Sequence, residues 1–397
     1  MNKIEKLLNE LCPNGVEFKS LGEVCEYIRG VTYAKNQEIQ DLDDGIKILR
    51  ANNITLNNVL DLRDLKVIHK NVKIKNTQFL KRQDILICAG SGSKEHIGKI
   101  AFIDRDMDFA FGGFMGVIRS KKINSRFLFF YLSSEYFRVF LKKELESSTI
   151  NNLNSALINK FQIPIPPLEI QEEIVKILDA FTELEAELEA ELEARRRQYE
   201  YYRNKLLSFE YLKTNGGGYE LKMLGEVCEI YDKLRKPVAK DKRVKGDYPY
   251  YGANGIQDYV NNYLFEGEYL LIGEDGSVIN KDNSPVLHFV NGKFWVNNHA
   301  HIIQSKNHNL RFIYYALQCC NIFDLVKGTP PKLNQENLKI IQIPIPSLET
   351  QIKIVSILDQ FHALTTDLTS GIPAEIEARK KQYEYYRNQL LTFKEAI

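Results

Sequence analysis

A block of about fifty residues occurs twice in this chain. The first copy, residues 161–209, opens with Phe-Gln-Ile-Pro-Ile-Pro-Pro-Leu-Glu and closes with Gln-Tyr-Glu-Tyr-Tyr-Arg-Asn-Lys-Leu-Leu-Ser-Phe. The second copy, residues 341–393, opens with Ile-Gln-Ile-Pro-Ile-Pro-Ser-Leu-Glu and closes with Gln-Tyr-Glu-Tyr-Tyr-Arg-Asn-Gln-Leu-Leu-Thr-Phe. Two near-identical blocks separated by dissimilar sequence indicate a duplicated framework that carries two different inserts.

Apolar residues in the first copy recur in steps of three and four, which is the spacing of a heptad seam. The seam predicts one helix from about 168 to 209 that packs against a second long helix. An extra step of four lies inside three tandem Glu-Leu-Glu-Ala units at 183–194, and such a stutter locally unwinds a left-handed supercoil. The seam residues predicted to make the contact are Phe181, Leu184, Leu188, Leu192, Tyr199 and Tyr202.

The second copy repeats this seam but contains a helix-breaking sequence. Gly371-Ile-Pro373 is expected to kink or split the helix, because proline removes a backbone donor and clashes with the preceding turn. We therefore predict one continuous helix in the first copy and a broken one in the second. The corresponding seam residues are Phe361, Leu364, Leu368, Tyr383 and Tyr386.

The segments between the repeated blocks, residues 21–160 and 224–340, resemble each other weakly. Both begin with Leu-Gly-Glu-Val-Cys, and residues 85–93 match residues 269–277. Short apolar runs bounded by polar residues predict strands, and denser runs predict helices. The two segments are therefore interpreted as one mixed α/β fold with divergent surfaces, in which Cys25 and Cys228 are buried structural thiols.

Composition excludes several classes of protein. Hydrophobic content of 44% and charged content of 26% are typical of a soluble globular protein with two or three domains. The N-terminus is too polar for a secretory signal and no apolar run reaches the length of a membrane span, so we expect a cytoplasmic protein without membrane contact. Six cysteines without a C-x-x-C pair indicate neither a zinc module nor a disulfide scaffold.

His299 and His301 alternate as strand neighbours do, and so two ligands could face one way toward a metal ion. No third ligand is evident nearby in the sequence. A strand face with two hydrogen-bonded histidines is therefore the preferred interpretation, and no metal site is predicted.

Basic residues are concentrated in two runs, although the net charge is only +1. Residues 66–82 contain six Lys or Arg and no acid, residues 233–245 contain seven against Asp241, and residues 183–193 carry six glutamates. Basic runs of this kind favour a nucleic-acid surface, whereas ordinary solvated charges explain them equally well.

No catalytic residue is predicted, because the chain has no G-x-x-x-x-G-K-[ST], no G-x-S-x-G and no Asn-Pro-Pro or Asp-Pro-Pro motif. The glycine-rich turns at 90–93 and 273–276 either contact phosphates or are tight turns between strands. The loop at 248–255 either presents Asn254 or a tyrosine to DNA or is a plain solvent loop. The predicted DNA contacts are Lys70, Lys73, Lys75, Arg82, Ser91, Ser93, Lys94, Lys99, Lys233, Arg235, Lys236, Lys242, Arg243, Lys245, Tyr250, Tyr251 and Asn254.

The two repeated blocks, together with the tandem Glu-Leu-Glu-Ala units, resemble the specificity (S) subunit of type I restriction–modification enzymes over essentially the whole chain. The resemblance implies an α+β fold with two mixed α/β target-recognition domains. Two long helices would join them as an antiparallel coiled coil with a pseudo-twofold internal repeat. The implied divisions are 1–160 and 216–340 for the recognition domains, and 161–215 and 341–397 for the conserved helical regions.

The resemblance also implies a function. Each domain would read one half of an asymmetric bipartite site in double-stranded DNA, two methyltransferase (M) subunits would dock, and restriction (R) subunits would join. S-adenosylmethionine, ATP and magnesium would bind those partners, and this chain would be a non-catalytic subunit without a cofactor. The competing interpretation is a non-enzymatic coiled-coil scaffold whose globular domains bind proteins. A steep salt dependence of DNA binding would distinguish the two.

Overall fold

The computed structural model describes residues 3–41, 44–146, 152–366 and 370–396. The chain forms two compact units: Met1–Glu187 with Ile376–Ile397, called the first unit, and Leu188–Glu375, called the second unit. Helix α6 (Leu168–Leu206) runs without a break from one into the other. Among the described residues no helix is both long and apolar enough to cross a membrane.

The first unit is built on an antiparallel sheet of four strands in the order β2-β9-β6-β7. Its central strand is buried on both faces: Ile85 and Ile87 pack toward α3, while Leu86 and Cys88 pack toward a second sheet. Burial on both faces explains why this strand is a continuous apolar run without alternation. The strands and helices are β2 (Cys25–Arg29), β9 (Met115–Ser120), β6 (Ile85–Cys88), β7 (Ile100–Phe102), α3 (Ser125–Leu132), α4 (Glu135–Glu146) and α5 (Ser155–Ile158).

The second sheet of the first unit has the order β3-β5-β4-β8, in which only the β4–β8 pair is parallel. A terminal part completes the unit, where Val16 N–H donates to the carbonyl of Lys394 at 2.8 Å. The remaining elements are β3 (Glu38–Ile39), β5 (Lys66–Ile68), β4 (Ile46–Leu49), β8 (Phe109–Phe111), α1 (Lys3–Leu11), β1 (Phe18–Ser20), α2 (Leu21–Val24) and β10 (Gln162–Pro164).

The second unit carries one larger sheet of six strands in the order β12-β17-β15-β16-β13-β14. Its strands and the helices around it are β12 (Cys228–Ile230), β17 (Ala300–Ser305), β15 (Phe265–Gly273), β16 (Leu287–Val296), β13 (Lys245–Gly252), β14 (Gly255–Val260), α7 (Phe209–Thr214), α8 (Leu224–Val227), α9 (Leu310–Leu317) and α10 (Gln335–Lys339). A separate pair joins β11 (Glu220–Met223) to β18 (Gln342–Ile345), as β1 joins β10 in the first unit.

The core sheets of the two units share one register, which confirms that the two variable regions have a common fold. Strand β2 pairs with β9 as β12 pairs with β17, and β6 pairs with β9 as β15 pairs with β17. The matching pairs are Cys25–Ser120 with Cys228–Ser305, and Ile85–Ile118 with Leu270–Ile303. The register corrects the sequence match by one residue, because that match aligned glycines in turns whose lengths differ. The prediction for the two thiols is confirmed, since burial raises the pKa of Cys25 and of Cys228 to about 12.

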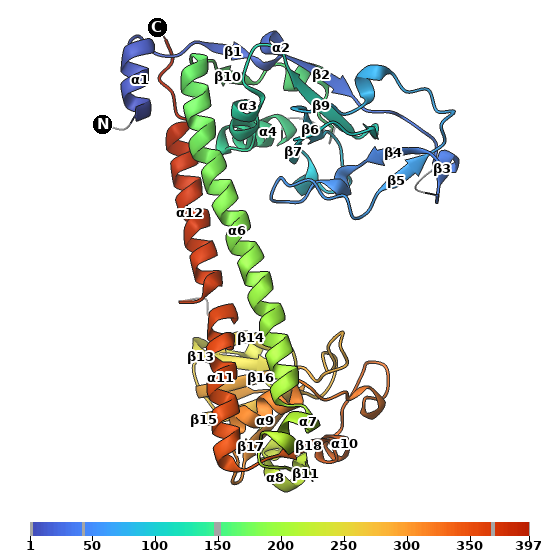
Figure 1. The fold of residues 1–397 in the computed structure, drawn as a ribbon, viewed down its shortest axis with the longest axis vertical. Helices are drawn as coiled ribbons and strands as arrows, with labels where there is room; N and C mark the ends of the chain where they lie inside the picture. The colour runs from blue at the N-terminus through green and yellow to red at the C-terminus, as the bar shows by residue number, and fades with distance from the viewer. Residues whose placement is uncertain (1–2, 42–43, 147–151, 367–369, 397) are drawn as a thin grey trace. The chain divides into compact units, whose positions relative to one another are not determined.

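The repeated blocks form three helices, as predicted from the break in the second copy. The first copy gives α6, which has 39 residues and is about 58 Å long at 1.5 Å per residue. The second copy gives α11 (Leu348–Thr366) and α12 (Ile372–Leu390), separated at the Gly-Ile-Pro sequence. Figure 1 shows α12 beside the first half of α6 in the first unit.

Aromatic residues of the predicted seam hold the helices together in an antiparallel sense. In the first unit the Phe181 ring lies 5.6 Å from Tyr386 and 6.2 Å from Tyr383, and further along α6 an ion pair joins Glu185 to Lys380. In the second unit the equivalent pairs are Tyr202 with Phe361 at 5.3 Å and Tyr199 with His362 at 6.3 Å. In both units the partner number falls as the number along α6 rises, so the paired helices run in opposite directions.

Two seam predictions need adjustment. Leu364 is 42% exposed, and Leu368 lies outside the described residues. Conversely, Leu178 is fully buried although it lies off the heptad seam. It packs into the core of the globular part together with Ile170 and Ile174, because the start of α6 buries a second face against the domain.

Each globular part is fastened to its helix by the same set of polar contacts. Arg126 pairs with Asp179 at 2.7 Å, and Arg311 pairs with Asp359 at 2.7 Å. The buried Gln171 accepts from the N–H of Asn124 at 2.9 Å, the residue that caps α3, and Gln351 does the same for the cap of α9. Buried side-chain amides with both ends bonded specify one docking geometry. The two inserts are therefore held on their helices in an equivalent way.

Candidate nucleic-acid interface

The basic run 233–245 forms a loop between β12 and β13 that internal contacts hold in one conformation. Trp295 donates from its indole N–H to the carbonyl of Lys236 at 2.6 Å. The Tyr250 hydroxyl accepts from the N–H of Val238 at 2.9 Å, and the Arg243 guanidinium stacks on the Tyr250 ring at 4.2 Å. A loop anchored in this way presents its lysines at little further entropic cost on binding.

Nine of the predicted DNA contacts are exposed. The first unit contributes those of the run 66–82, and the second unit contributes those of the loop 233–245 and of the β13–β14 turn. Ser93 is exposed as well, Ser91 and Tyr251 are half-buried, and the side chain of Lys94 lies outside the described set. The exposed residues are Lys70, Lys73, Lys75, Arg82, Lys233, Lys236, Lys242, Lys245 and Asn254.

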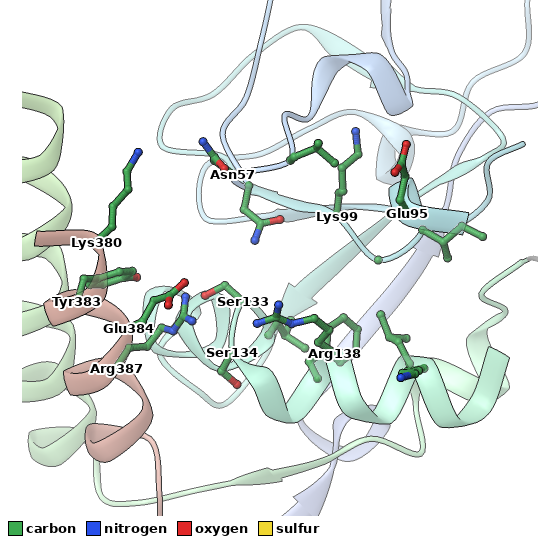
Figure 2. Close-up of a pocket in the computed structure, with 18 of the residues that line it drawn as sticks. Asn57, Glu95, Lys99, Ser133, Ser134, Arg138, Lys380, Tyr383, Glu384 and Arg387 are labelled. Atoms are coloured by element: carbon green, nitrogen blue, oxygen red, sulfur yellow. The ribbon is translucent and has the colours of Figure 1, made fainter. Parts of the chain in front are cut away.

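Four predicted contacts serve the interior instead, and we revise them. The Lys99 ammonium donates to the carbonyls of Ala51, at 3.0 Å, and Ile54, and this burial lowers its pKa. Figure 2 shows Lys99 at the wall of a cavity of about 740 Å³, with Ser133, Ser134 and residues of α12 across from it. The other three are Arg235, Arg243 and Tyr250, whose polar atoms bind partners within the second unit. Residue type alone cannot distinguish these from their exposed neighbours.

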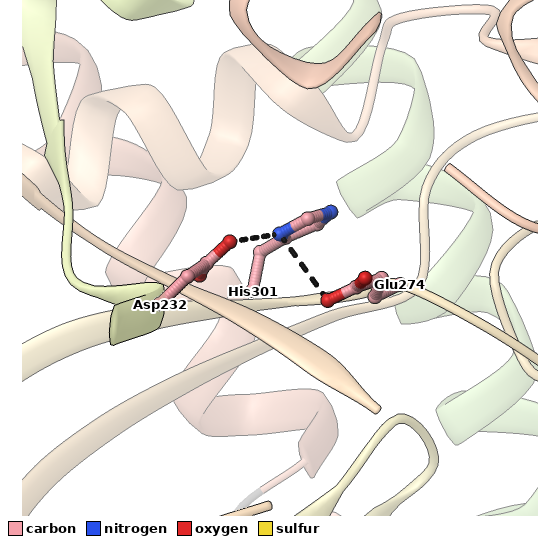
Figure 3. A group of neighbouring side chains, drawn as sticks. All are labelled: Asp232, Glu274 and His301. Carbon is pink, nitrogen blue, oxygen red and sulfur yellow. Dashed lines mark hydrogen bonds and ion pairs between the residues drawn. The ribbon is translucent and has the colours of Figure 1, made fainter. Parts of the chain in front are cut away.

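A buried charged cluster lies beside the basic loop (Figure 3). His301, which is 1% exposed, places Nδ1 2.6 Å from a carboxylate oxygen of Asp232 and Nε2 2.8 Å from the carbonyl oxygen of Leu333. Both partners are acceptors, so the ring can donate to both only as the imidazolium ion. Glu274 lies 3.7 Å from Nδ1, and Arg235 donates to Glu274 at 2.6 Å.

The cluster is balanced by its own cations. Burial raises the pKa of Asp232, but the hydrogen bond from His301 and the charges of His301 and Arg235 outweigh it and lower the pKa below its usual range. Oxygen and nitrogen atoms of Asp232, Glu274 and His301 approach within 4.8 Å of one another, which is close enough to ligate a metal ion. Since His301 has no free lone pair and Arg235 and Lys332 bind the carboxylates, we assign this cluster a structural role.

The prediction for the histidine pair is confirmed in its preferred form and corrected in one respect. Both His299 and His301 are hydrogen-bonded, to Asp275 and Asp232 respectively. The absence of a third potential ligand was wrong, because the fold brings Asp232 and Glu274 to His301 from distant parts of the sequence. The Leu-Leu-Ile-Gly-Glu-Asp segment carried no signal that its acids would be buried.

A second cavity, of about 780 Å³, lies in the first unit at the end of the core sheet. Arg29, Arg50, Asn52 and Phe114 line it together with four glycines. Phe114 is 70% exposed, and the Nε atom of Arg50 is buried without a hydrogen-bond partner among the described residues. The sequence analysis identified only Ser91 and the glycine-rich turn at this place. The signal for Phe114 was its position between two glycines and a strand, where a buried role is not required.

The comparisons with known proteins agree with this architecture. The family described as "Type I restriction modification DNA specificity domain" matches residues 13–194 and 217–378. A Haemophilus influenzae protein described as a type I restriction enzyme specificity subunit is 46% identical over 186 residues, which are 45% of this chain and 48% of that protein. The chain thus spans about half the length of that relative.

Two further proteins match over more of their length. A Mycoplasma pneumoniae protein described as a type I specificity subunit is 34% identical over 248 residues, which are 59% of this chain and 98% of that protein. The crystal structure of a type I restriction–modification S subunit from M. genitalium superimposes with a TM-score of 0.55 and 16% identity, covering 95% of each chain. At that identity the superposition concerns the fold alone.

Proposed function

This chain belongs to the family of type I restriction–modification DNA specificity subunits, and we propose that its two globular parts read the two halves of a bipartite site in double-stranded DNA. The observation that carries this proposal is the common frame of the two units: one strand register, one set of helix-docking contacts and two different sets of loops. A duplicated frame suits two half-sites, and different loops suit two different half-site sequences. The recognition domains are proposed to span 1–160 and 216–340, joined by helical regions 161–215 and 341–397.

We propose that the partners are the methyltransferase (M) subunits and the restriction (R) subunits of the same system. S-adenosylmethionine, ATP and magnesium would act on those partners, and this chain would direct them to the site. Two M subunits fit the internal repeat, because each copy of Gln-Tyr-Glu-Tyr-Tyr-Arg offers the same outward surface. Tyr201 and Tyr385, at equivalent places, are each 59% exposed.

Exposed lysines of the loop 233–245 are proposed to contact phosphates. We expect the double substitution Lys236→Gln/Lys242→Gln to reduce the slope of log affinity against log salt by about 2, since each phosphate contact contributes about 0.9. The measurement is DNA binding by the assembled complex across a salt series. Lys213→Gln, which removes an exposed charge of α7 in the same unit, is the matched control and should leave the slope unchanged. An unaltered slope in the double variant would remove this loop from the interface.

Adjacent tyrosines of the repeat are expected to separate partner binding from stability. Tyr202 packs on Phe361 at 5.3 Å, so Tyr202→Ala should cost about 3 kcal/mol of unfolding free energy in the second unit. Tyr201→Ala/Tyr385→Ala should leave stability unchanged and weaken co-purification of the M subunits, because exposed tyrosines are common anchors of interfaces. Full recovery of M subunits with the double variant would exclude this surface as their contact.

A further inference from the structure

The loops at one end of the core sheet occupy equivalent places in the two units. Extending the shared register by one residue beyond the strands pairs the same backbone groups: the Ala89 N–H donates to the carbonyl of Phe114 at 2.8 Å, and the Glu274 N–H donates to the carbonyl of His299 at 2.9 Å. Isolated bridges then join Gly90 to Asn152 and Asp275 to Lys332. The equivalent positions are Arg29 with Asp232, Ala89 with Glu274, Gly90 with Asp275, Phe114 with His299, Gly116 with His301 and Asn152 with Lys332.

The side chains at these equivalent positions differ completely in chemistry. In the second unit they are charged and bind one another: Asp232 and Glu274 are neutralised by His301, Arg235 and Lys332. In the first unit the acids are replaced by an arginine and an alanine, and no ion pair replaces the cluster among the described residues at these positions. The first unit has the 780 Å³ cavity at this place instead.

Phe114 is the most conspicuous side chain of the cavity. Its ring is 70% exposed at the tip of a turn closed by the Met115 N–H, which donates to the carbonyl of Gly112 at 2.7 Å. The ring rests against Gly90, where a Cβ atom would lie 3.2 Å from Cδ1 of Phe114. Packing against Gly90 on one side holds the ring while its other surface stays in water.

The surroundings of Phe114 suit a polyanion. Arg29 is exposed on the cavity wall, and Arg50 brings a guanidinium whose Nε is unpaired. Gly92 faces open space, since a Cβ atom there would meet nothing within 4 Å. Glycines of this kind let a nucleic-acid backbone or base edge approach the main chain closely.

We propose that Phe114 is a specificity-determining residue of the first unit, whose ring contacts a base of the half-site while Arg29 and Arg50 flank it. This proposal rests on the proposed function and deepens it by naming the reader. An exposed aromatic ring recognises the thymine methyl group or a base face, and arginines beside it hold phosphates or guanine. In the second unit His299, 48% exposed and bonded to Asp275, takes the same position with polar chemistry, so the two half-sites are read differently.

The test uses the full chain assembled with the methyltransferase subunits of its system, and the methylated sites are sequenced genome-wide. For Phe114→Ala we expect discrimination at one or two positions of a single half-site to fall by about 10-fold, the scale of one base–aromatic contact. Phe114→Tyr keeps the ring and should restore the original target. His299→Ala should relax the other half-site only. The spacing between the half-sites should be unchanged in all three.

Phe323→Ala is the matched control, since Phe323 is 63% exposed in the second unit away from these loops, and its target should be that of the unaltered protein. Co-purification of the methyltransferase subunits shows that each variant is folded. Unchanged discrimination with Phe114→Ala in a folded complex would overturn the proposal, as would relaxation of the same half-site by Phe114→Ala and His299→Ala. If the unaltered complex methylates no bipartite site, the proposed function fails instead.

Discussion

Removal of the four residues 187–190 from α6 is expected to shorten the gap between the two half-sites without altering either half-site sequence. The deletion shortens a continuous helix by about 6 Å and turns its ends by about 40° relative to each other. That length corresponds to one or two base-pair steps, because B-DNA rises about 3.4 Å per pair. Genome-wide sequencing of methylated sites made by the variant complex gives both the half-sites and their spacing.

Helix pairing is expected to survive this deletion. The Glu185–Lys380 ion pair lies before the removed residues, and the Tyr199–His362 contact lies after them. Removing one Glu-Leu-Glu-Ala unit also removes the stutter, so the apolar steps along α6 become regular. Duplication of residues 187–190 is the matched counterpart and should lengthen the gap by the same amount. A changed base within either half-site, or an unchanged gap in both variants, would contradict the role of α6 as a spacer.

Substitution of the buried carboxylate Asp232 by asparagine is expected to destabilise the second unit by about 3 kcal/mol. The change leaves His301 and Arg235 with reduced compensation in a buried place, and breaking a buried ion pair costs about 3–5 kcal/mol. Trp295, the single tryptophan of the chain, lies in the same unit and binds Lys236. Its fluorescence during urea unfolding therefore reports the stability of this unit.

Acid should erase the difference between the two proteins. Because the pKa of Asp232 is lowered in the folded state, its contribution is complete above the unfolded value of about 3.9 and is lost as the pH falls through the folded pKa. We expect the gap in stability between the unaltered protein and Asp232→Asn to be constant near neutral pH and to shrink below about pH 4. Asp275→Asn is the control, since its partner His299 is 48% exposed, and it should cost under about 1 kcal/mol. Equal costs for the two substitutions would show that burial of the cluster contributes little.

Periodic features were predictable from the sequence because they depend on local chain geometry. The heptad steps predicted α6 and its partners, and Gly371 with Pro373 predicted the division between α11 and α12. Leu178 escaped this reasoning, since the start of α6 packs against a globular core as well as against a helix. The repeated Leu-Gly-Glu-Val-Cys predicted two buried thiols in equivalent places, and both are buried.

The candidate interface was predictable only in part. The basic run 233–245 does lie at the surface, yet Arg235 and Arg243 within it bind carboxylates and carbonyls of the interior. Tyr250 was taken as a reader of bases, and the fold buries it to 1% exposure under that run. An arginine in a basic run looks the same whether its partner is a phosphate or a carboxylate some forty positions away, such as Glu274 for Arg235.

The sequence by itself determined the duplication, the long and the broken helix, the family of the chain and the division into two readers, because each of these follows from repetition or from periodicity. Only the tertiary structure decided which charged residues face outward and what lies at the end of each core sheet. The shared strand register sets Phe114 opposite His299 and Arg29 opposite Asp232 in equivalent frames. Side chains far apart in sequence meet there because strand pairing brings them together, and no local pattern records that pairing.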